Sequence, residues 1–365
     1  MNDRQRFAAV MDYGTPDRLP RYIFGYWDET LQRWNNEGLD SARDTFLQLG
    51  LDTDWEGRMW AHHDMLNMWR FCDVPDTVLE ETIEWKTVRN GFGDVVRTSK
   101  MGSGLPQHLE YGFELTRDYW TRVVKPSFDP MSSNRFVAGW EAKAKVLTTR
   151  SNVACFVGGS LYGTLRDWMG VEKVSYLMYD EPALLEEMLD WISNFYVTLY
   201  TPVAPRADFD FVYFWEDCCG KSGPLFSPAI YRAHFHKYYQ RMIDAYRKLG
   251  VKHFLIDSDG WVEALAPCWV ESGFDLLFPI EPGTWHGDPR AFRRRFGRSL
   301  RMMGGVDKHV IARGGQAIRD ELMKFRDLAT EGGYLPMPDH RIPPDVSLDD
   351  MRRYVAIYQE VFDRC

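Results

Sequence analysis

Short apolar runs that end in ionisable residues recur in the second half of the chain. Five of them lie between residues 210 and 340, and they read DFVYFWEDCC, HFLIDSDGW, FDLLFPIEP, LRMMGGVDK and GGYLPMPDH. Such runs, separated by helix-length amphipathic stretches, predict buried strands of a parallel sheet. Charge at the carboxyl end of a buried strand has no structural use there, so we expect these ends to form an active site.

Three further runs complete the set of predicted strands. Residues 18–27, 51–59 and 152–160 carry the same kind of run, and helical patterns separate them. Eight strands that alternate with helices are the number that closes a (β/α)8 barrel. The sequence therefore predicts an α/β fold of the TIM-barrel type, with a doubly wound sheet as the alternative.

One segment interrupts the alternation. Residues 84–134 contain WKTVRNGFGDVVRTSK, in which alternating residues flank Asn90-Gly91, a strong signal for a hairpin turn. We expect a β-hairpin insertion after the second strand, lying over the barrel mouth, within a single domain that spans residues 1–365. Elsewhere, Ser227 and Pro228 predict the start of a helix that Gly250 ends.

Composition and charge indicate which kinds of partner the protein can bind. The chain has 44 basic and 53 acidic residues, a net charge of -9, and no basic stripe with interleaved aromatics, so nucleic acid is an unfavourable partner. It has no apolar segment of signal-peptide or membrane-spanning length. Six cysteines without CxxC spacing fit a reducing compartment. We expect a cytoplasmic protein that acts on a small molecule, without a membrane or nucleic-acid partner.

The run HFLIDSDGW offers the strongest catalytic candidates. Carboxyl ends of parallel barrel strands open onto one face, and Asp257 and Asp259 lie two residues apart, so both side chains point to the same side. Gly260 permits a turn or the approach of a ligand. Crowded carboxylates raise one another's pKa, which supplies a protonated general acid beside an ionised base. Alternatively, or in addition, Asp259 caps a helix that begins at Trp261.

Other strand ends add acids whose orientation the sequence leaves open. Glu216 and Asp217 are adjacent, so only one of them can face the lumen. Glu281 precedes Pro282, and a turn role suits it as well as a catalytic one.

The last two strand ends combine acids with bases. Asp307 and Lys308 offer a pair that could position a substrate anion. Asp339 could raise the pKa of His340 and orient it as a proton donor, unless Arg341 pairs with the aspartate instead. The predicted catalytic residues are Asp257, Asp259, His340, Glu216 and Asp307. The predicted substrate-binding residues are Arg21, Asp217, Glu281, Lys308, Asp339, Trp27, Trp55, Tyr213 and Trp261.

No motif fixes a metal or a nucleotide. HxxxH, HExxH and CxxC spacings are absent from the sequence, as are GxGxxG and GxxxxGK. The neighbouring Cys218 and Cys219 could supply thiolates, but a role as small buried residues is the better interpretation. We predict no metal ligands and no tightly bound cofactor, and the presence of a metal stays open.

The order of motifs resembles one family. WEDCCGKSGPLFSP, IDSDGW, FPIEP, GGVDK and GGYLPMPDHRIPPDV, with RFAAVMDYGTPDRLPR at the start, resemble the uroporphyrinogen decarboxylase superfamily over nearly the whole chain. The resemblance implies a (β/α)8 barrel and a homodimer. It also implies either decarboxylation of a tetrapyrrole or methyl transfer that serves a corrinoid protein or a thiol.

Departures from the family pattern separate these activities. Where the true decarboxylases carry an arginine-rich RQAGR segment, this chain reads RYIFGYWDET, and Arg21 alone cannot replace that cluster. Where the thiol methyltransferases carry HxCG, this chain has DSDG at residues 257–260, which removes the imidazole and thiolate of their zinc site.

The resemblance therefore favours transfer of a methyl group from a small methylated substrate, such as an aryl or alkyl methyl ether, to the cobamide of a corrinoid protein. One alternative is a decarboxylase or other lyase that acts on a tetrapyrrole or a smaller acid, with Arg21 and Lys308 as carboxylate clamps. A second is a sugar hydrolase with a carboxylate pair such as Glu216 and Asp307. A binding module without turnover is the non-enzymatic alternative.

Overall fold

The eight predicted strands are present and lie parallel. The structure is a computed structural model that describes residues 1–54, 65–101 and 105–363. Six strands form one sheet in the order β14-β13-β12-β11-β8-β7. They are β7 (Cys155–Val157), β8 (Phe211–Trp215), β11 (His253–Asp257), β12 (Leu276–Ile280), β13 (Arg301–Val306) and β14 (Tyr334–Pro338). β1 (Tyr22–Ile23) and β2 (Thr53–Asp54) form a separate parallel pair.

The large sheet continues towards β1. Tyr26, just after β1, pairs in parallel with Ile342, just after β14. Across the described part of the chain, no ladder joins β2 to β7. The strand order is therefore that of a TIM barrel, and the α/β class predicted from the apolar runs is confirmed.

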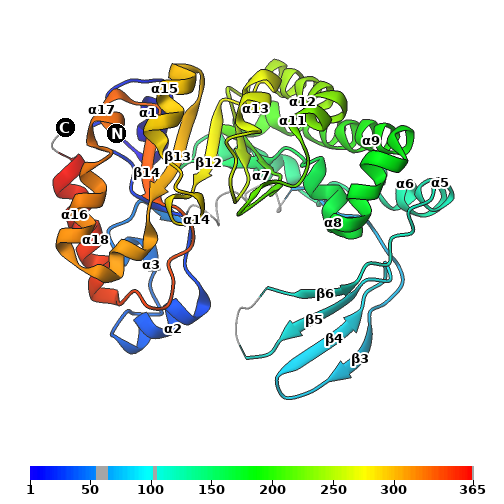
Figure 1. Ribbon diagram of the computed structural model, residues 1–365, viewed down its shortest axis with the longest axis horizontal. Helices are drawn as coiled ribbons and strands as arrows, with labels where there is room; N and C mark the ends of the chain where they lie inside the picture. The colour runs from blue at the N-terminus through cyan, green and yellow to red at the C-terminus, as the bar shows by residue number, and fades with distance from the viewer. Residues whose placement is uncertain (55–64, 102–104, 364–365) are drawn as a thin grey trace.

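Helices surround the parallel strands (Figure 1). The longer ones are α1 (Asp3–Met11), α2 (Asp28–Asn36), α7 (Trp140–Leu147), α8 (Tyr162–Asp180), α9 (Pro182–Tyr200), α12 (His236–Lys248), α13 (Ala266–Ser272), α15 (Pro289–Phe296), α16 (Gly315–Met323), α17 (Arg326–Glu331) and α18 (Leu348–Phe362). The short ones are α3 (Thr45–Gln48), α5 (Arg117–Tyr119), α6 (Lys125–Ser127), α10 (Ala204–Ala207), α11 (Pro228–Ile230) and α14 (Pro282–Trp285). None of the helices in the described ranges is long and apolar enough to cross a membrane.

Local signals in the sequence explain the helix ends. The Ser227 hydroxyl accepts the N–H of Ile230 and caps α11, with Pro228 in the first turn. A π-helical turn, Tyr231–Phe235, joins α11 to α12. Gly250 follows at a φ of +100°, a conformation that glycine adopts without strain. The predicted helix therefore begins and ends where its caps place it.

The alternation of side chains along β8 and β11 decides what faces the lumen. Phe214 points outward, because it packs against Tyr239 and Tyr246 of α12. Its neighbours Tyr213 and Trp215 must then point inward. Asp257 pairs in register with Trp215 and therefore points inward as well. Every residue of β11, β12 and β14 is buried, as expected for a parallel sheet covered on both faces.

The insertion between β2 and β7 is a four-stranded antiparallel sheet. It consists of β3 (Thr77–Glu81), β4 (Trp85–Arg89), β5 (Val95–Ser99) and β6 (Gln107–Glu110). The predicted hairpin is β4–β5, where Asn90 N–H donates to Asp94 O at 2.9 Å. The insertion starts earlier than the predicted residue 84, because β3 also belongs to the sheet.

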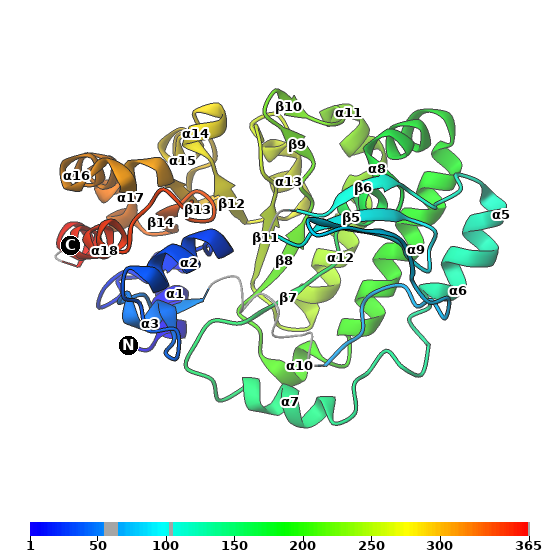
Figure 2. The ribbon, with the colours of Figure 1, turned by 90° about the horizontal axis from the view of Figure 1, so that it is seen from below.

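The inserted sheet stands away from the barrel strands (Figure 1), and the chain that follows β6 contacts α8. In Figure 2 the inserted sheet lies on the side of the molecule away from both chain ends. Lys173 Nζ of α8 donates to the carbonyl oxygens of Tyr111 and Phe113, at 2.9 and 2.6 Å. Tyr111 also packs against Gly170, where α8 kinks. A side chain at Gly170 would occupy the position of this ring.

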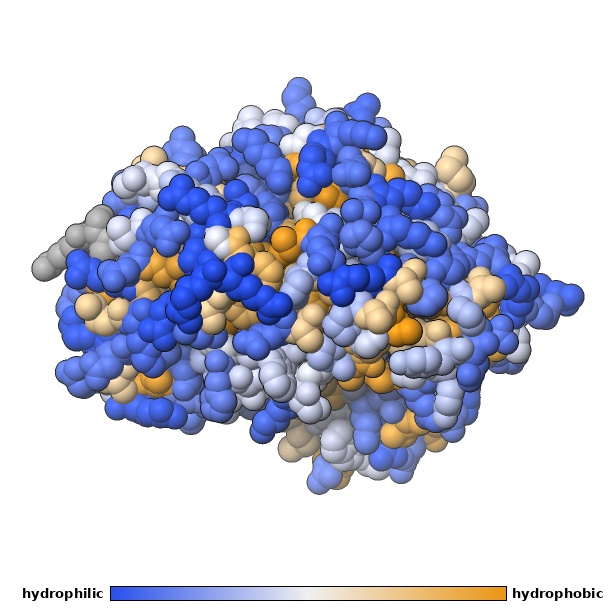
Figure 3. Space-filling model, turned by 45° about the horizontal axis from the view of Figure 1, so that its top comes forward, coloured by the Kyte–Doolittle hydropathy of each residue, from blue (hydrophilic) through white to orange (hydrophobic). Residues whose placement is uncertain are grey.

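The surface is mostly hydrophilic. Figure 3 shows blue side chains over most of one face, with hydrophobic side chains gathered near its middle.

Candidate active site

Asp257, the last residue of β11, lies buried in the lumen beneath the strand ends. The Tyr213 hydroxyl donates a hydrogen bond to its Oδ2 atom. Burial and then the charge of Asp259 raise the pKa of Asp257 well above its usual range, although the Tyr213 bond lowers it. Burial therefore favours the protonated form of the Asp257 carboxyl group. Tyr213, predicted to bind substrate, instead holds this carboxyl group, because both side chains point into the lumen from neighbouring strands.

Asp259 lies two residues further on, on a turn fixed by Glu281. The Gly260 N–H donates to Glu281 Oε2 at 2.7 Å, and Thr284 donates to Oε1 at 3.1 Å. Burial and the charges of Glu281 and Asp217 raise the pKa of Asp259 to about 7. Its side chain remains 44% exposed, so it can contact a ligand. Glu281 therefore stabilises the turn, which is one of the two roles predicted for it.

The helix-cap alternative for Asp259 is wrong. α13, the next helix, begins only at Ala266. The chain between them runs along the β9–β10 hairpin, where Trp261 N–H donates to Gly220 O at 2.9 Å. In this hairpin, β9 (Cys219–Gly220) pairs with β10 (Gly223–Pro224).

His340 lies beside Asp259, and its pKa shifts in the direction opposite to the one expected. Its Nε2 atom is 3.6 Å from Asp259 Oδ2. Burial, and then the charges of Lys308 and Arg341, lower the pKa of His340 to about 4. The imidazole is therefore neutral near pH 7. The prediction that Asp339 raises the pKa of His340 is wrong. Asp339 pairs with Lys308 instead, so the positive charges of Lys308 and Arg341 determine the shift.

Asp339 lies at the end of β14, buried at the bottom of the site. Its Oδ1 atom is 3.5 Å from Lys308 Nζ, so lysine takes the partnership that the sequence offered to His340 or Arg341. Burial raises the pKa of Asp339, and Lys308 opposes this shift.

The Asp307 carboxylate binds His309, which was not among the predicted site residues. Its Oδ1 atom accepts the N–H of His309 at 3.0 Å and lies 2.8 Å from His309 Nδ1. This carboxylate therefore orients both the backbone and the ring of His309, in a 3-10 helix at Lys308–Arg313. The sequence signal that could have identified His309 is its position two residues after the strand-end acid Asp307. A side chain at Gly283 of α14 would contact His309, Asp307 and Asp339, so the ends of β12, β13 and β14 converge here.

Of the adjacent acids after β8, Glu216 turns away from the lumen. Its carboxylate accepts the N–H groups of Leu161, Tyr162 and Gly163 at 2.8, 3.0 and 3.1 Å, and the Tyr239 hydroxyl. Burial raises the pKa of Glu216 to about 7, against these hydrogen bonds. These donors hold Glu216 against the start of α8, and its predicted catalytic role stays a prediction.

Asp217 is the member of the pair that faces the acids. It adopts a φ of 47°, a left-handed conformation that reverses the chain after Glu216. Its carboxylate pairs with Arg166 at 3.0 Å, and its N–H donates to Asp257 O at 3.2 Å. The charge of Asp217 contributes to the raised pKa of both Asp257 and Asp259.

The remaining predicted binding residues are Arg21 and three tryptophans. Arg21 precedes β1 and pairs with Asp363, just after α18, so it lies at the amino ends of the strands. Its predicted contact with substrate is wrong, because only residues that follow a strand reach the mouth. Trp27 lies near His340, with ring centroids 6.3 Å apart. Trp261 is partly exposed beside the β9–β10 hairpin. Trp55 lies outside the described residues.

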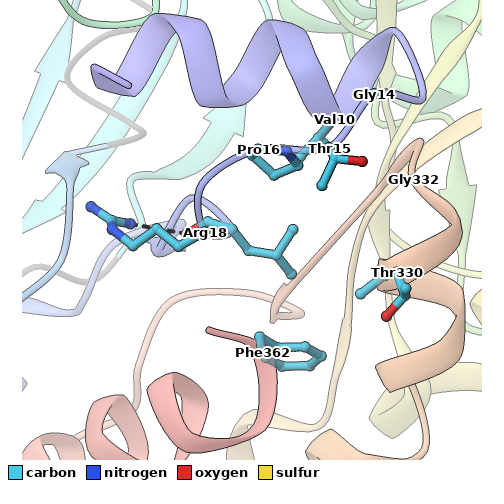
Figure 4. A pocket seen from close by; sticks show the side chains of 10 residues that line it. Val10, Gly14, Thr15, Pro16, Arg18, Thr330, Gly332 and Phe362 are labelled. Carbon is cyan, nitrogen blue, oxygen red and sulfur yellow. Dashed lines mark hydrogen bonds between the residues drawn. The ribbon is translucent and has the colours of Figure 1, made fainter. Parts of the chain in front are cut away.

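A cavity at the amino ends of the strands lies opposite the acids (Figure 4). It is lined by Val10, Gly14, Thr15, Pro16, Arg18, Leu19, Ala329, Thr330, Gly332 and Phe362. These residues come from the end of α1, from the connection between α1 and β1, and from the segments that precede β14 and end α18. The cavity is therefore separate from the catalytic candidates.

The residues at the mouth do not fit a thiolate and imidazole zinc site. DSDG supplies oxygen donors alone, and Asp257 is already bound to Tyr213. Within residues 1–54, 65–101 and 105–363, no group of three or more His, Cys, Asp or Glu side chains is placed to hold a metal ion.

Parallel strands whose carboxyl ends carry protonatable acids define an enzyme site of the TIM-barrel type. A family model described as uroporphyrinogen decarboxylase (URO-D) matches residues 144–361. The chain belongs to this family, as its motifs predict, and it is an enzyme of the URO-D superfamily.

Two curated relatives agree with this assignment, and one solved structure shares the fold. A uroporphyrinogen decarboxylase from Methylococcus capsulatus is 27% identical over 194 residues, which are 52% of each chain. Another from Hydrogenovibrio crunogenus is 24% identical over 196 residues, again 52% of each. The chain thus spans about half the length of the curated relatives it matches. A methyltransferase from Methanosarcina mazei has a TM-score of 0.56 and 14% identity over 99% of both chains, which shows a shared fold.

Proposed function

We propose that this enzyme transfers a methyl group from a small methyl ether to a corrinoid protein. The observation that carries this proposal is the pair of neighbouring acids Asp257 and Asp259 at the end of β11: the pKa of Asp257 is raised, and that of Asp259 is raised to about 7, so part of the Asp259 carboxyl groups hold a proton at neutral pH. An ether oxygen is a poor leaving group unless it is protonated as the C–O bond breaks. Asp259 is the exposed member of the pair and is the proposed proton donor.

In the proposed step the methyl group leaves the ether oxygen, and a proton is transferred to that oxygen. The C–O bond breaks, the methyl group passes to the acceptor, and the Asp259 O–H proton passes to the leaving oxygen. Asp259 ends the step as a carboxylate, while Asp257 keeps the hydrogen bond that it accepts from the Tyr213 hydroxyl. The cobamide of the partner protein, when bound, supplies the nucleophile.

The charges around Asp259 are less favourable for the other activities. A polycarboxylate substrate would meet Asp217 and Glu281, while Arg21 lies at the far end of the strands and Lys308 pairs with Asp339. A hydrolase that uses Glu216 and Asp307 would need free carboxylates, but the first binds α8 and the second binds His309. A neutral methyl ether avoids both difficulties.

The test combines the purified protein, a cob(I)amide-loaded corrinoid protein and a panel of methyl ethers. Methyl transfer changes the absorption spectrum of the corrinoid. Asp259→Asn should lower the rate by about 10²–10⁴-fold, the range for loss of general acid catalysis. Asp190→Asn is the matched control, since Asp190 is a half-exposed aspartate on α9. No spectral change with any ether, using a corrinoid protein shown to be competent, would contradict the proposal.

The homodimer implied by the resemblance stays a prediction. Size-exclusion chromatography with light scattering would test it.

A further inference from the structure

Arg166 is a buried cation near the start of α8 for which the proposed chemistry gives no role. Its side chain is 14% exposed, and it lies in the second turn of the helix, beside the end of β8. Removing a guanidinium group from water is costly unless hydrogen bonds and opposite charges replace the water. The partners of Arg166 therefore indicate what this cation does.

Arg166 binds the turn that follows β8. Its Nη1 atom donates to the carbonyl oxygens of Asp217 and Glu216, at 2.7 and 3.3 Å, and lies 3.0 Å from Asp217 Oδ2. Asp217 has a φ of 47°, a conformation that is uncommon for residues other than glycine. One guanidinium group therefore holds both the unusual backbone and the carboxylate of Asp217.

Other contacts fix the orientation of Arg166. The guanidinium group lies over the Trp215 ring, 5.4 Å from its centroid, and its Nη2 atom donates to Asp167 Oδ1 at 3.2 Å. In return, the Glu216 carboxylate accepts three N–H groups at the start of α8. The helix and the turn therefore bind each other in both directions, which leaves Arg166 little freedom to move away from Asp217.

Asp217 is the acid near Asp259 that Arg166 neutralises. Glu281 and Asp217 are the two acids whose charges most raise the pKa of Asp259. Glu281 accepts its hydrogen bonds from a backbone N–H and a threonine hydroxyl, whereas Asp217 is paired with a cation. The charged and titratable groups that act on Asp259 from the strand ends are Asp217, Asp257, Glu281, Lys308, Asp339 and His340.

We propose that Arg166 is a positioning residue of this active site, which holds the Asp217 carboxylate at the edge of the site and offsets its charge. Without Arg166, Asp259 would face the full negative charge of Asp217, and its carboxyl group would keep its proton to a higher pH. The inference rests on the proposed function, because it concerns the proposed proton donor. It adds a residue of α8 to a site otherwise built from strand ends.

The test measures the titration of Asp259 directly, without a corrinoid protein or a substrate. The protein is isotopically labelled at the aspartate carboxyl carbon, and its NMR spectrum is followed as the pH is raised through the midpoint. The signal of Asp259 is the one that disappears in Asp259→Asn. Arg166→Gln should raise the titration midpoint by about 0.5–1 pH unit, less than the roughly 1–3 units that a direct charged neighbour produces.

Two further variants test whether the charge of Arg166 is the cause. Arg166→Lys keeps the positive charge but cannot make the same set of hydrogen bonds, so the midpoint should rise less than in Arg166→Gln. Asp217→Asn should lower the midpoint. Asp217→Asn combined with Arg166→Gln should return it towards the wild-type value, because the two opposite charges are removed together.

Arg150→Gln is the matched control. Arg150 is 5% exposed and also binds backbone carbonyl oxygens and an aspartate, Asp210, but the residues that it binds precede β8, at the end of the barrel opposite the mouth. Arg150→Gln should lower stability in urea, as Arg166→Gln does, and leave the Asp259 midpoint unchanged. If Arg166→Gln does not fold, Arg166→Met replaces it, because a side chain of similar length keeps the packing against Trp215.

The outcomes separate this inference from the proposed function. An unchanged or lower midpoint in Arg166→Gln would overturn the inference, and so would an equal rise in Arg166→Lys or in Arg150→Gln. The expected shifts without any methyl transfer would support the role of Arg166 and contradict the proposed function. Methyl transfer with an unchanged midpoint in Arg166→Gln would support the proposed function and overturn the inference.

Discussion

Replacing Glu216 by alanine should destabilise the fold strongly, because this buried carboxylate accepts three backbone N–H groups at the start of α8 and the Tyr239 hydroxyl. Each buried donor left without a partner costs about 1–3 kcal/mol. Three N–H groups therefore set a lower limit of about 3 kcal/mol. Measured losses on breaking buried charged contacts are about 3–5 kcal/mol, so we expect a loss in this range.

The assay is equilibrium urea unfolding followed by circular dichroism, with two variants for comparison. Tyr239→Phe removes one donor and keeps the carboxylate, so it should cost about 1 kcal/mol. Glu187→Ala removes a carboxylate that also binds several donors, namely Lys125, Trp120 and Arg117, but is more exposed. It should cost less than about 1 kcal/mol. A Glu216→Ala variant no less stable than Glu187→Ala would refute the reasoning.

Three further predictions concern the turn that carries Asp259. The methyl-transfer rate should fall as the pH rises through about 7, because Asp259 must hold its proton. Asp217→Asn should move this fall in rate to lower pH, because it removes a like charge beside Asp259. A pH–rate profile checks both. The pKa of Asp259 is higher in the folded state than its unfolded value of about 4, so its contribution to stability is lost between about pH 4 and 7, and Asp259→Asn should make urea stability fall less steeply there. Gly260→Ala should lower the melting temperature and the rate, because its Cβ would lie 2.5 Å from Cys219 O at a φ of +83°; an unchanged melting curve would contradict this.

The barrel strands were predictable because burial on both faces requires continuous apolar runs. β8, FVYFW, and β12, LLFPI, have no polar residue that would mark a solvent-facing side. β3 was not predicted, since its residues TVLEE are all exposed and show no apolar alternation. The Asn90-Gly91 turn identified only the hairpin beside it.

Strand-end acids were predictable as a group, but their directions were not. The positions of Asp257 and Asp259 follow from the alternation along β11 and from the turn at Gly260. The division between Glu216 and Asp217 depends on the left-handed backbone of Asp217, which no residue pattern near it signals. Arg21 could have been placed correctly, because a residue that precedes a strand lies at the end opposite the mouth.

The charge around Asp259 also bears on how the proposed cycle would finish. Burial and then the charges of Glu281 and Asp217 raise its pKa, so the carboxylate left after proton transfer is destabilised by the same surroundings. That destabilisation drives Asp259 to take up a proton again, and its partly exposed side chain lets water deliver it. A substrate that brought further carboxylates would add to the repulsion before the step, whereas a neutral ether would not. The acidic surroundings therefore favour a reaction that begins with a neutral substrate and a protonated Asp259.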